Sequence, residues 1–323
     1  MLETILLSQG HSLNEVVDGQ MFRGVQTVAD DLFIIDKPTR DRLVILDPRC
    51  ALVVRRVLRA ADLRAWHQHD RAYYLLALRP GVDLDRYGPI SDYLAPHRSR
   101  LEGLGPAGRR WYDLPDLPEE ALLAPERLVW PLQAAWRRCS LLAAGPLLAG
   151  DCGFTPVAEP FLLGLIASRV AGWLLPRLDA AGGDPVALLP VPPAPEQARI
   201  ALGEQVLALT ALARDRHTRD REVQQRILRD LGPLGAQLSP ALQQWWRLDF
   251  DAFRTELLSA LKNDIPVRYR DAWEVWLDEQ RRGYNEQSDA LARLEAELNR
   301  QVYHLFELTA EQIDTIEAET SVA

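Results

Sequence analysis

The chain has 323 residues, enough for about two domains, and its 47% hydrophobic and 26% charged residues exclude a disordered or collagen-like protein. The net charge of −9 excludes a protein that coats nucleic acid regardless of sequence, although one basic face could still bind DNA. The most apolar stretch, 161–175, is shorter than the about 20 residues of a membrane span. No signal peptide is visible, so we expect a cytoplasmic protein.

The first part of the chain has the pattern of short strands. Apolar or β-branched runs interrupted by Asp, Pro and Arg predict strands at Phe33–Ile35, Leu43–Leu46, Ala51–Val54 and Tyr73–Leu78. Residues 88–120 are rich in Pro and Gly and indicate a loop with one helix near 90–104. A further strand is expected at Leu128–Trp130, and a buried helix at Phe161–Leu178.

The pattern changes to helices from Pro195 onward. We expect helices over 195–212, 218–231 and 267–280, with two shorter ones after Pro240 and Asp249. The last long helix begins near Ser288, and its apolar stripe recurs at three- and four-residue steps: Leu291, Leu294, Leu298, Val302 and Leu305. Thr309–Gln312 is a capping box that predicts a final short helix.

These patterns predict an α+β protein with a boundary near Gly182-Gly183. Residues 1–182 are expected to form a mixed α/β domain, and residues 183–323 an all-helical connector and C-terminal domain. Residues 1–170 carry 20 basic and 21 acidic side chains, whereas 171–323 carry 17 and 25. Within the first part, Arg42–Arg71 holds seven arginines and three aspartates, either a phosphate-binding face or a solvated surface.

No motif in the chain indicates a catalytic centre. Gly103–Gly108 has the spacing G-x-G-x-x-G, but it follows no predicted strand and contains Pro106, unlike a dinucleotide-binding loop. His67 and His69 lack a third ligand at a recognisable spacing, and the three cysteines are too scattered for a metal knuckle. We therefore expect no enzymatic activity and no cofactor in this chain.

Seven segments follow one another in a characteristic order: Gln20–Ile35, Val57–Arg64 with Tyr73–Leu76, Ile90–Leu114, Arg127–Pro131, Phe161–Leu175, Leu188–Gln197 and Leu294–Glu317. In this order they resemble the C-terminal specificity region of DNA adenine-N6 methyltransferases, the group of type IIG restriction–modification enzymes, TaqI-like specificity domains and BREX-type PglX methyltransferases. The sequence departs from the usual residues of this group at Val28 and Ala60, where glycine is usual, at Asn299 in place of Asp, and at Glu307 in place of Gly.

The resemblance implies a DNA target-recognition domain at residues 1–182. In such enzymes the methyltransferase half precedes this region and carries the S-adenosylmethionine loop and the catalytic motif. The chain is then expected to be a separate specificity subunit or the C-terminal part of a split methyltransferase. Its partners would be double-stranded DNA and an adenine-specific DNA methyltransferase or other defence-system subunit, which would hold the S-adenosylmethionine.

Sequence-specific binding needs side chains that hold phosphates and side chains that read bases. The resemblance makes one set of arginines candidates for phosphate or base contact: Arg55, Arg56, Arg59, Arg64, Arg98, Arg100, Arg109 and Arg110. Candidates for base edges are Gln26, Thr27, Gln68 and His69. Arg23 and Lys37 complete the expected DNA-binding set, and Trp111-Tyr112 is expected to pack in the core.

Two alternatives stay open from the sequence. The chain could be a protein–protein interaction or scaffold subunit of a defence complex that does not read DNA, with the acidic helical part as its active surface. It could also be an enzyme whose site has no recognisable motif. The sequence does not indicate which DNA sequence is recognised, whether the system cleaves, only methylates or excludes phage otherwise, or the stoichiometry.

Overall fold

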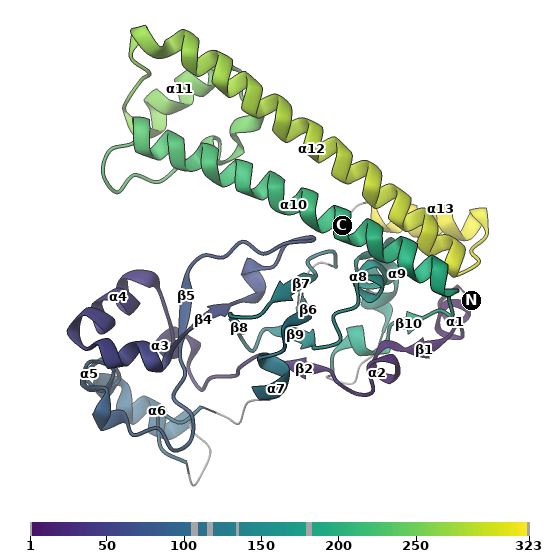
Figure 1. The fold of residues 1–323 in the computed structure, drawn as a ribbon, viewed down its shortest axis with the longest axis horizontal. Helices are drawn as coiled ribbons and strands as arrows, with labels where there is room; N and C mark the ends of the chain where they lie inside the picture. The colour runs from purple at the N-terminus through teal and green to yellow at the C-terminus, as the bar shows by residue number, and fades with distance from the viewer. Residues whose placement is uncertain (1, 105–108, 115–118, 134–135, 179–182, 322–323) are drawn as a thin grey trace. The chain divides into compact units, whose positions relative to one another are not determined.

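In the computed structural model, residues 2–104, 109–114, 119–133, 136–178 and 183–321 are described. They form two compact units (Figure 1). Unit 1 comprises Met1–Val206 and Asn299–Ala323, and unit 2 comprises Leu207–Leu298. The expected α+β class is confirmed, because unit 1 carries the sheets and unit 2 is helical in its described elements.

Unit 1 contains three small sheets. Their strands are β1 (His11–Ser12), β2 (Phe22–Arg23), β3 (Ile34–Ile35), β4 (Val54–Leu58), β5 (Tyr73–Leu76), β6 (Glu126–Pro131), β7 (Ser140–Ala143), β8 (Leu147–Leu148), β9 (Cys152–Thr155) and β10 (Pro190–Val191). The sheet orders are β1-β10, β2-β9-β6-β7 and β3-β5-β4-β8. The β4–β8 pair is parallel and the other strand pairs are antiparallel.

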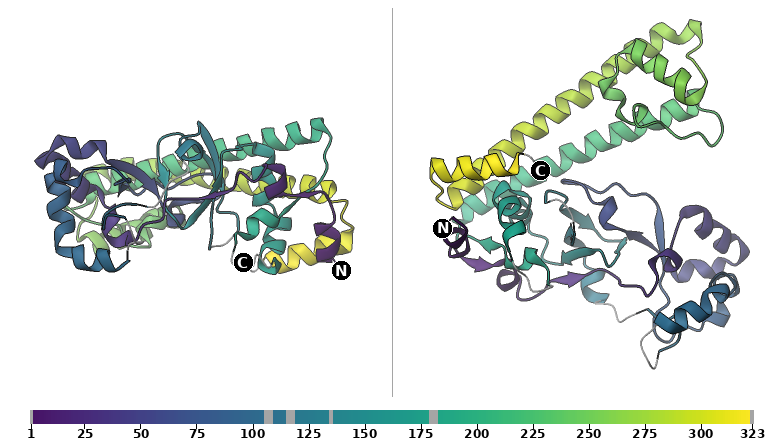
Figure 2. Two further views of the ribbon diagram at one scale, coloured as in Figure 1. Left: turned by 90° about the horizontal axis from the view of Figure 1, so that it is seen from below. Right: turned by 180° about the vertical axis from the view of Figure 1, so that it is seen from behind.

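Short helices surround these sheets, and long ones follow. They are α1 (Leu2–Leu7), α2 (Leu13–Val16), α3 (Asp30–Phe33), α4 (Lys37–Leu46), α5 (Gly88–Leu94), α6 (Arg98–Leu104), α7 (Glu119–Leu122), α8 (Pro160–Ala167), α9 (Arg169–Leu174), α10 (Glu196–Leu231), α11 (Phe250–Leu261), α12 (Arg270–Leu305) and α13 (Ala310–Thr320). Helix α1 lies beside the end of α12, where the Gln9 side chain donates to the Phe306 carbonyl (Figure 2).

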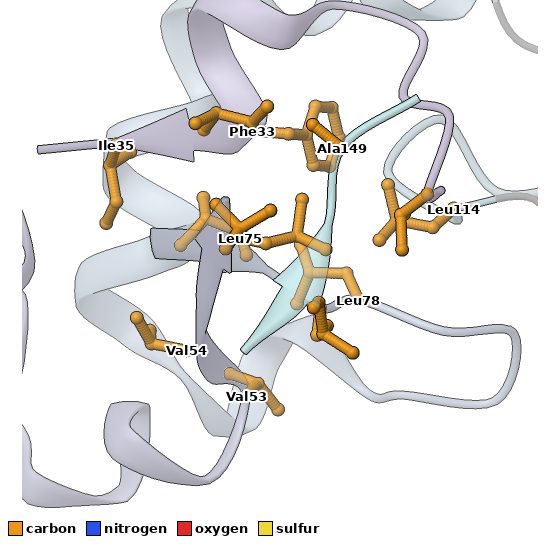
Figure 3. Packing of buried hydrophobic residues seen from close by; sticks show 14 of the residues in the cluster. Phe33, Ile35, Val53, Val54, Leu75, Leu78, Leu114 and Ala149 are labelled. Atoms are coloured by element: carbon orange, nitrogen blue, oxygen red, sulfur yellow. The ribbon is translucent and has the colours of Figure 1, made fainter. Parts of the chain in front are cut away.

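A hydrophobic core lies against the β3-β5-β4-β8 sheet (Figure 3). Phe33, Leu75 and Leu78 are completely buried in it, and Ala149 and Leu114 join it from distant parts of the chain. Such burial stabilises the fold by about 1.5–3 kcal/mol for each large aliphatic side chain. This core fixes β4, which carries Arg55 and Arg56, and β5, to which β4 is connected by the segment that holds Arg59 and Arg64.

Unit 2 has its own core, in which Trp245, Phe253 and Leu277 are completely buried. Arg219 on α10 joins the unit-2 part of α12 by hydrogen bonds from Nη1 to Gln280 Oε1 (2.8 Å) and from Nε to Gln287 Oε1 (3.2 Å). The unit carries 14 basic and 16 acidic side chains, a net charge of −2. Most of the acidic excess of residues 171–323 therefore lies outside unit 2.

Several sequence predictions of elements are confirmed. Strands form at Ile34–Ile35, Tyr73–Leu76 and within Glu126–Pro131, and the Thr309 capping box opens α13. The expected packing of Trp111-Tyr112 is also confirmed, since Tyr112 is buried and Trp111 is packed against the same core.

Other element predictions are wrong. Leu43–Leu46 is the end of α4, because the Asp36 side chain caps a helix that includes Pro38 in its first turn. Residues 48–52 form a 3₁₀ helix, and β4 starts only at Val54. The expected single helix at 90–104 is divided into α5 and α6, with a 3₁₀ turn that contains Pro96 between them.

The helix boundaries after residue 160 also differ from the predictions. Ser168 divides the expected helix at 161–178, because its hydroxyl accepts from Ala171 N–H and starts α9. Conversely, α10 and α12 are each one helix of 36 residues where two shorter helices were expected. The polar stretches around 213–217 and 281–287, where the sequence predicts helix ends, lie within continuous helices. Their side chains are exposed to solvent or form hydrogen bonds with other side chains.

The compact units differ from the predicted boundary near residue 182. The first turns of α10 belong to unit 1 and lie against α8. A Cβ atom added at Gly164 on α8 would be only 3.0 Å from Val206 Cγ2 on α10. The chain end also returns to unit 1, since Arg169 on α9 forms an ion pair of 2.8 Å with Glu317 on α13. Tertiary contacts between distant segments, which no local composition change signals, set these limits.

Candidate nucleic-acid interface

The connection between β4 and β5 carries three arginines, Arg59, Arg64 and Arg71, and two aspartates, Asp62 and Asp70. After β4, a 3₁₀ turn (η2, Ala60–Asp62) leads into a narrow loop closed by an antiparallel bridge between Leu63 and Gln68. Trp66 and Ala72 in this segment have positive φ angles of 68° and 67°. Non-glycine residues adopt this conformation at a cost of about 1–2 kcal/mol, so the surrounding contacts must hold the loop in place.

The β6–β7 hairpin supplies these contacts. Trp66 N–H donates to the Cys139 carbonyl (3.1 Å), and the Gln68 amide donates to Ser140 Oγ (2.6 Å) and the Leu141 carbonyl (2.9 Å). Arg138, just before β7, donates to the carbonyls of Ala60 (2.5 Å) and Leu63 (3.0 Å). The loop is therefore held by a hairpin about 70 residues further along the chain.

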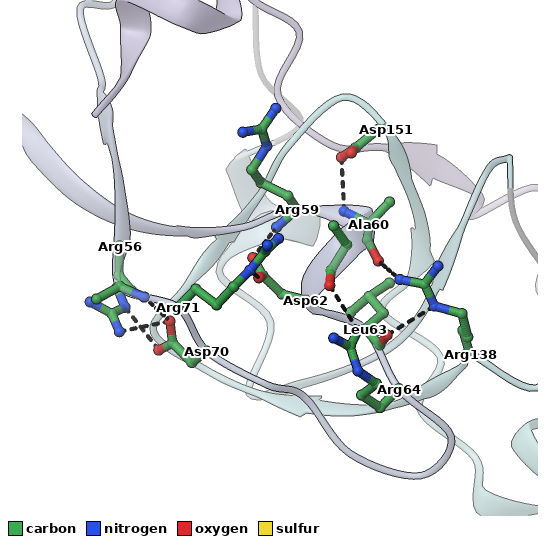
Figure 4. Close-up of polar contacts among 12 residues, drawn as sticks. Arg56, Arg59, Ala60, Asp62, Leu63, Arg64, Asp70, Arg71, Arg138 and Asp151 are labelled. Carbon is green, nitrogen blue, oxygen red and sulfur yellow. Dashed lines mark hydrogen bonds and ion pairs between the residues drawn. The ribbon is translucent and has the colours of Figure 1, made fainter. Parts of the chain in front are cut away.

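Carboxylates hold the other side of the η2 turn. Asp62 is completely buried and accepts from Arg71 Nε (2.5 Å) and from the Arg59 backbone N–H (2.9 Å). The Ala60 backbone N–H donates to Asp151 Oδ1 (3.0 Å), as Figure 4 shows. These bonds orient the backbone from which Arg59 and Arg64 project.

Two adjacent tyrosines on β5 are each flanked by two arginines. Arg59 and Arg71 lie 5.6 Å from the ring of Tyr73, measured from the guanidinium carbon to the ring centre. Arg56 and Arg40 lie 4.9 and 5.4 Å from the ring of Tyr74. Successive residues of a strand face opposite sides, so the two sets lie on different faces of the sheet.

We define the arginine cluster as Arg59, Arg64, Arg71 and Arg138. Asp62 and Asp151 accompany it, so four guanidinium groups lie near two carboxylates and the local net charge is +2. Arg56 is tied to Asp70 by two contacts, Nε–Oδ2 at 2.8 Å and Nη2–Oδ1 at 2.6 Å. Burial, together with the charges of Arg138 and Arg71, lowers the pKa of Arg64 below its ordinary value.

Gln26 comes close to this cluster. Val25 forms a bridge with Ala149, and a side chain at Gly150 would meet Gln26 Cγ at 3.0 Å. The next residue, Asp151, binds the η2 turn. Gln26 is exposed, whereas the neighbouring Thr27 hydroxyl donates to Asp30 (2.5 Å). Gln26 therefore lies next to a segment, Ala149–Asp151, whose last residue binds the η2 turn.

The structure brings together only part of the expected set. Arg56, Arg59, Arg64, Gln68 and His69 belong to the β4–β5 segment, and Arg55 on β4 faces the opposite side of the strand from Arg56. Both amide hydrogens of Gln68 are used on Ser140 and Leu141, so in this conformation its amide donors hold the loop. The His69 backbone N–H donates to the Asp62 carbonyl (2.7 Å).

The other expected residues lie elsewhere in unit 1 and have local partners. On α6, Arg98 pairs with Glu102 (2.7 Å), and Arg100 makes a two-bond pair with Asp31 (2.8 and 3.0 Å). Lys37 pairs with Asp41 within α4.

The arginines before Trp111 brace the backbone. Arg109 donates to the Leu114 carbonyl (3.1 Å), and Arg110 donates to the Val82 carbonyl (3.0 Å) and to the Tyr112 hydroxyl (2.7 Å). Their guanidinium groups therefore have structural partners in this region.

Arg23, on β2, lines a separate cavity of about 410 Å³. Met21, Phe22, Leu132 and Asp184 are among the other residues of its wall. Asp184 accepts from Trp130 Nε1 (2.6 Å), and burial raises the pKa of its carboxyl group. This cavity mixes apolar walls with one charged residue of each sign.

Sequence reasoning missed Arg71, Arg138 and Asp62 as parts of the site. Arg71 and Asp62 lie in the basic run Arg42–Arg71, but no local spacing indicates that they pair. Arg138 carries no local signal, since its partners Ala60 and Leu63 are 78 and 75 residues away. The G-x-G-x-x-G spacing at 103–108 lies largely outside the described residues. Among the described residues, no group of three His, Cys, Asp or Glu could hold a metal ion.

Residues 195–302 match a family model described as a domain of unknown function, DUF8810. No curated protein sequence matches the chain. The fold is similar to part of the type IIL restriction–modification enzyme MmeI, solved in complex with DNA, with 13% sequence identity and a TM-score of 0.42.

That match covers 84% of this chain but only 36% of MmeI, so the chain spans about a third of the length of the enzyme. At this score the likeness carries no argument about activity. In the described part of the chain, no helix is both long and apolar enough to cross a membrane.

Proposed function

We propose that this chain is a non-catalytic DNA sequence-specificity module that directs a DNA adenine-N6 methyltransferase of a restriction–modification or phage-defence system to its site. The observation that carries the proposal is the meeting of distant segments at the η2 turn: Arg138 of the β6–β7 hairpin and Asp151 both bind this turn, and the exposed Gln26 lies next to Gly150. The sequence resemblance to target-recognition regions supports the same role. S-adenosylmethionine and the catalytic groups would belong to the partner subunit.

The arrangement suits the two tasks of specific DNA binding. The Tyr73 ring lies within 5.6 Å of the guanidinium groups of Arg59 and Arg71, a contact that restricts their orientation, and planar guanidinium groups match phosphate oxygens. A glutamine amide can make two hydrogen bonds to adenine, worth about 1–3 kcal/mol in discrimination. A loop held at both ends loses little entropy when it binds.

Arg55 and Arg59 are the best residues for testing phosphate contact. In the described part of the chain neither side chain forms an ion pair with a carboxylate, whereas Arg56 is committed to Asp70. R55A/R59A should weaken duplex binding for all sequences and reduce the slope of log Kd against log salt concentration by up to about 1.8. Fluorescence anisotropy over a salt series, with and without the candidate methyltransferase subunit, measures both quantities.

The matched control is R221A/R282A, which removes two exposed arginines of unit 2. It should leave the salt slope of the wild type unchanged. An unchanged slope in R55A/R59A would reject the phosphate role of these arginines. If the chain binds the methyltransferase but no DNA, alone or in the complex, the scaffold alternative is favoured.

Gln26 should affect sequence preference and not general affinity. Q26A is expected to relax discrimination at one base pair by about 1–3 kcal/mol, because a bidentate contact is lost, while the salt slope stays at the wild-type value. Competition binding with a randomised duplex library measures the preference at each position. A uniform loss over all positions would contradict the assignment of Gln26 to a base edge.

A further inference from the structure

Three guanidinium groups lie at the η2 turn, and within the described residues only one of them is paired with a carboxylate. Arg71 is paired with the buried Asp62, while Arg64 and Arg138 bind only backbone carbonyls: Ala61 and Leu63 for Arg64, Ala60 and Leu63 for Arg138. Figure 4 shows Arg64 and Arg71 of the β4–β5 connection and Arg138, which lies just before β7, at the same short turn. Charges held together in this way repel one another unless an anion lies between or beside them.

These three arginine side chains also have N–H groups that the contacts above do not use. Arg64 uses Nη1 for its carbonyl contacts, Arg138 uses Nε and Nη2, and Arg71 uses Nε. Within the described residues, the other N–H groups of these three arginines have no hydrogen-bond acceptor. The carbonyl contacts of Arg64 and Arg138 fix both side chains before any ligand arrives, which reduces the entropy lost on binding.

The electrostatics agree with the geometry. The pKa of Arg64 lies below its ordinary value because of burial first and the neighbouring charges of Arg138 and Arg71 second. A half-buried cation with other cations beside it favours an oxyanion, because charge-assisted N–H···O⁻ bonds are about twice as strong as neutral ones. Planar guanidinium forks match phosphate oxygens in particular.

We propose that Arg64, Arg71 and Arg138 form an oxyanion site that takes one phosphate group of a polynucleotide backbone. The polynucleotide occupant rests on the proposed function, whereas the oxyanion site itself does not. The site would anchor the backbone beside Arg59 and Gln26 and so set the register in which those side chains meet the duplex.

Thermal unfolding of the full chain in phosphate and in chloride, at equal ionic strength, tests the site without DNA. Inorganic phosphate at about ten times its Kd should raise the Tm of the wild type by about 3 °C more than that of R64M. General stabilisation by phosphate acts on all variants alike, and R221M serves as the matched arginine control. An equal response in wild type and R64M overturns the oxyanion site, even if DNA binds.

A conservative variant separates ligand binding from folding. R64K keeps one positive charge and can still reach a carbonyl, but it loses the planar fork, so it should fold as the wild type does in chloride and lose at least half of the phosphate response. A full phosphate response in R64K would overturn the role of the guanidinium fork.

Duplex DNA tests the occupant. The same R64K variant should raise the Kd for duplex about 3–10-fold, and inorganic phosphate should compete with duplex in the wild type. A phosphate response without any binding of duplex, alone or with the methyltransferase subunit, keeps the oxyanion site but overturns its polynucleotide occupant and the proposed function together.

Discussion

Asp264 is the most strongly stabilised carboxylate of unit 2. It accepts from Arg254 through two contacts (2.7 and 3.1 Å), from Arg270 Nη2 (2.8 Å) and from the Ile265 N–H (2.7 Å). The Arg254 hydrogen bonds chiefly hold the pKa of Asp264 at about 2, below its ordinary 3.8. One carboxylate therefore joins α11 to the start of α12.

Asp264 should make unit 2 sensitive to acid. Its folded-state pKa lies below the unfolded value, so its stabilisation is complete above pH 3.8 and is lost as the pH falls through about 2. D264N should lower the Tm at pH 7 and show a smaller further loss than the wild type between pH 4 and pH 2. Circular dichroism melts over this range measure the effect, with D289N as an exposed control. Parallel acid profiles for wild type and D264N would contradict the prediction.

The boundary between α8 and α9 is set by two side chains, one of which comes from a distant segment. Ser168 ends α8 and starts α9, because its hydroxyl accepts from Ala171 N–H (3.3 Å) and donates to the Leu165 carbonyl (2.7 Å). Asn299 on α12 accepts from the Arg169 N–H (2.8 Å), so the α9 N-terminus is capped by two segments. The α9 helix in turn carries Arg169, which binds α13.

The Ser168 cap should therefore contribute to the stability of unit 1. S168A removes the hydroxyl that caps α9 and should lower the free energy of unfolding by about 1–2 kcal/mol. Urea denaturation measures the change. S99A, at an exposed position of α6, is the matched control and should stay within about 0.5 kcal/mol of the wild type. Equal midpoints for the two variants would mean that water replaces the cap without loss.

The core against the β3-β5-β4-β8 sheet in unit 1 and the core of unit 2 share no residue. We expect differential scanning calorimetry to resolve two transitions, because compact units with separate cores unfold as separate cooperative units. D264N should lower only the transition of unit 2.

Arg127 provides the opposite test. It is buried in unit 1 and donates to the carbonyls of Leu122, Ala143 and Pro146. R127M should lower only the transition of unit 1; a common shift in both variants would show that α10 and α12 couple the units.

Much of the local structure could be predicted from the sequence. Four features depend on neighbours within about four residues. They are the α+β class, the change to helices after Pro195, the Thr309 capping box and most of the buried stripe from Leu291 to Val302. The concentration of arginines between Arg42 and Arg71 was also visible. Contacts of this range leave periodic or positional patterns in the chain.

The candidate site depended on the tertiary structure. Arg138 binds the η2 turn across more than 70 residues, Gln26 lies next to Gly150, whose neighbour Asp151 binds that turn, and Gln68 holds the loop. The extent of α10 and α12 as single helices, and the return of α13 to unit 1, were likewise decided by packing. Hydrogen bonds and ion pairs between distant segments obey no sequence spacing, because the fold and not the chain sets the distance between their partners.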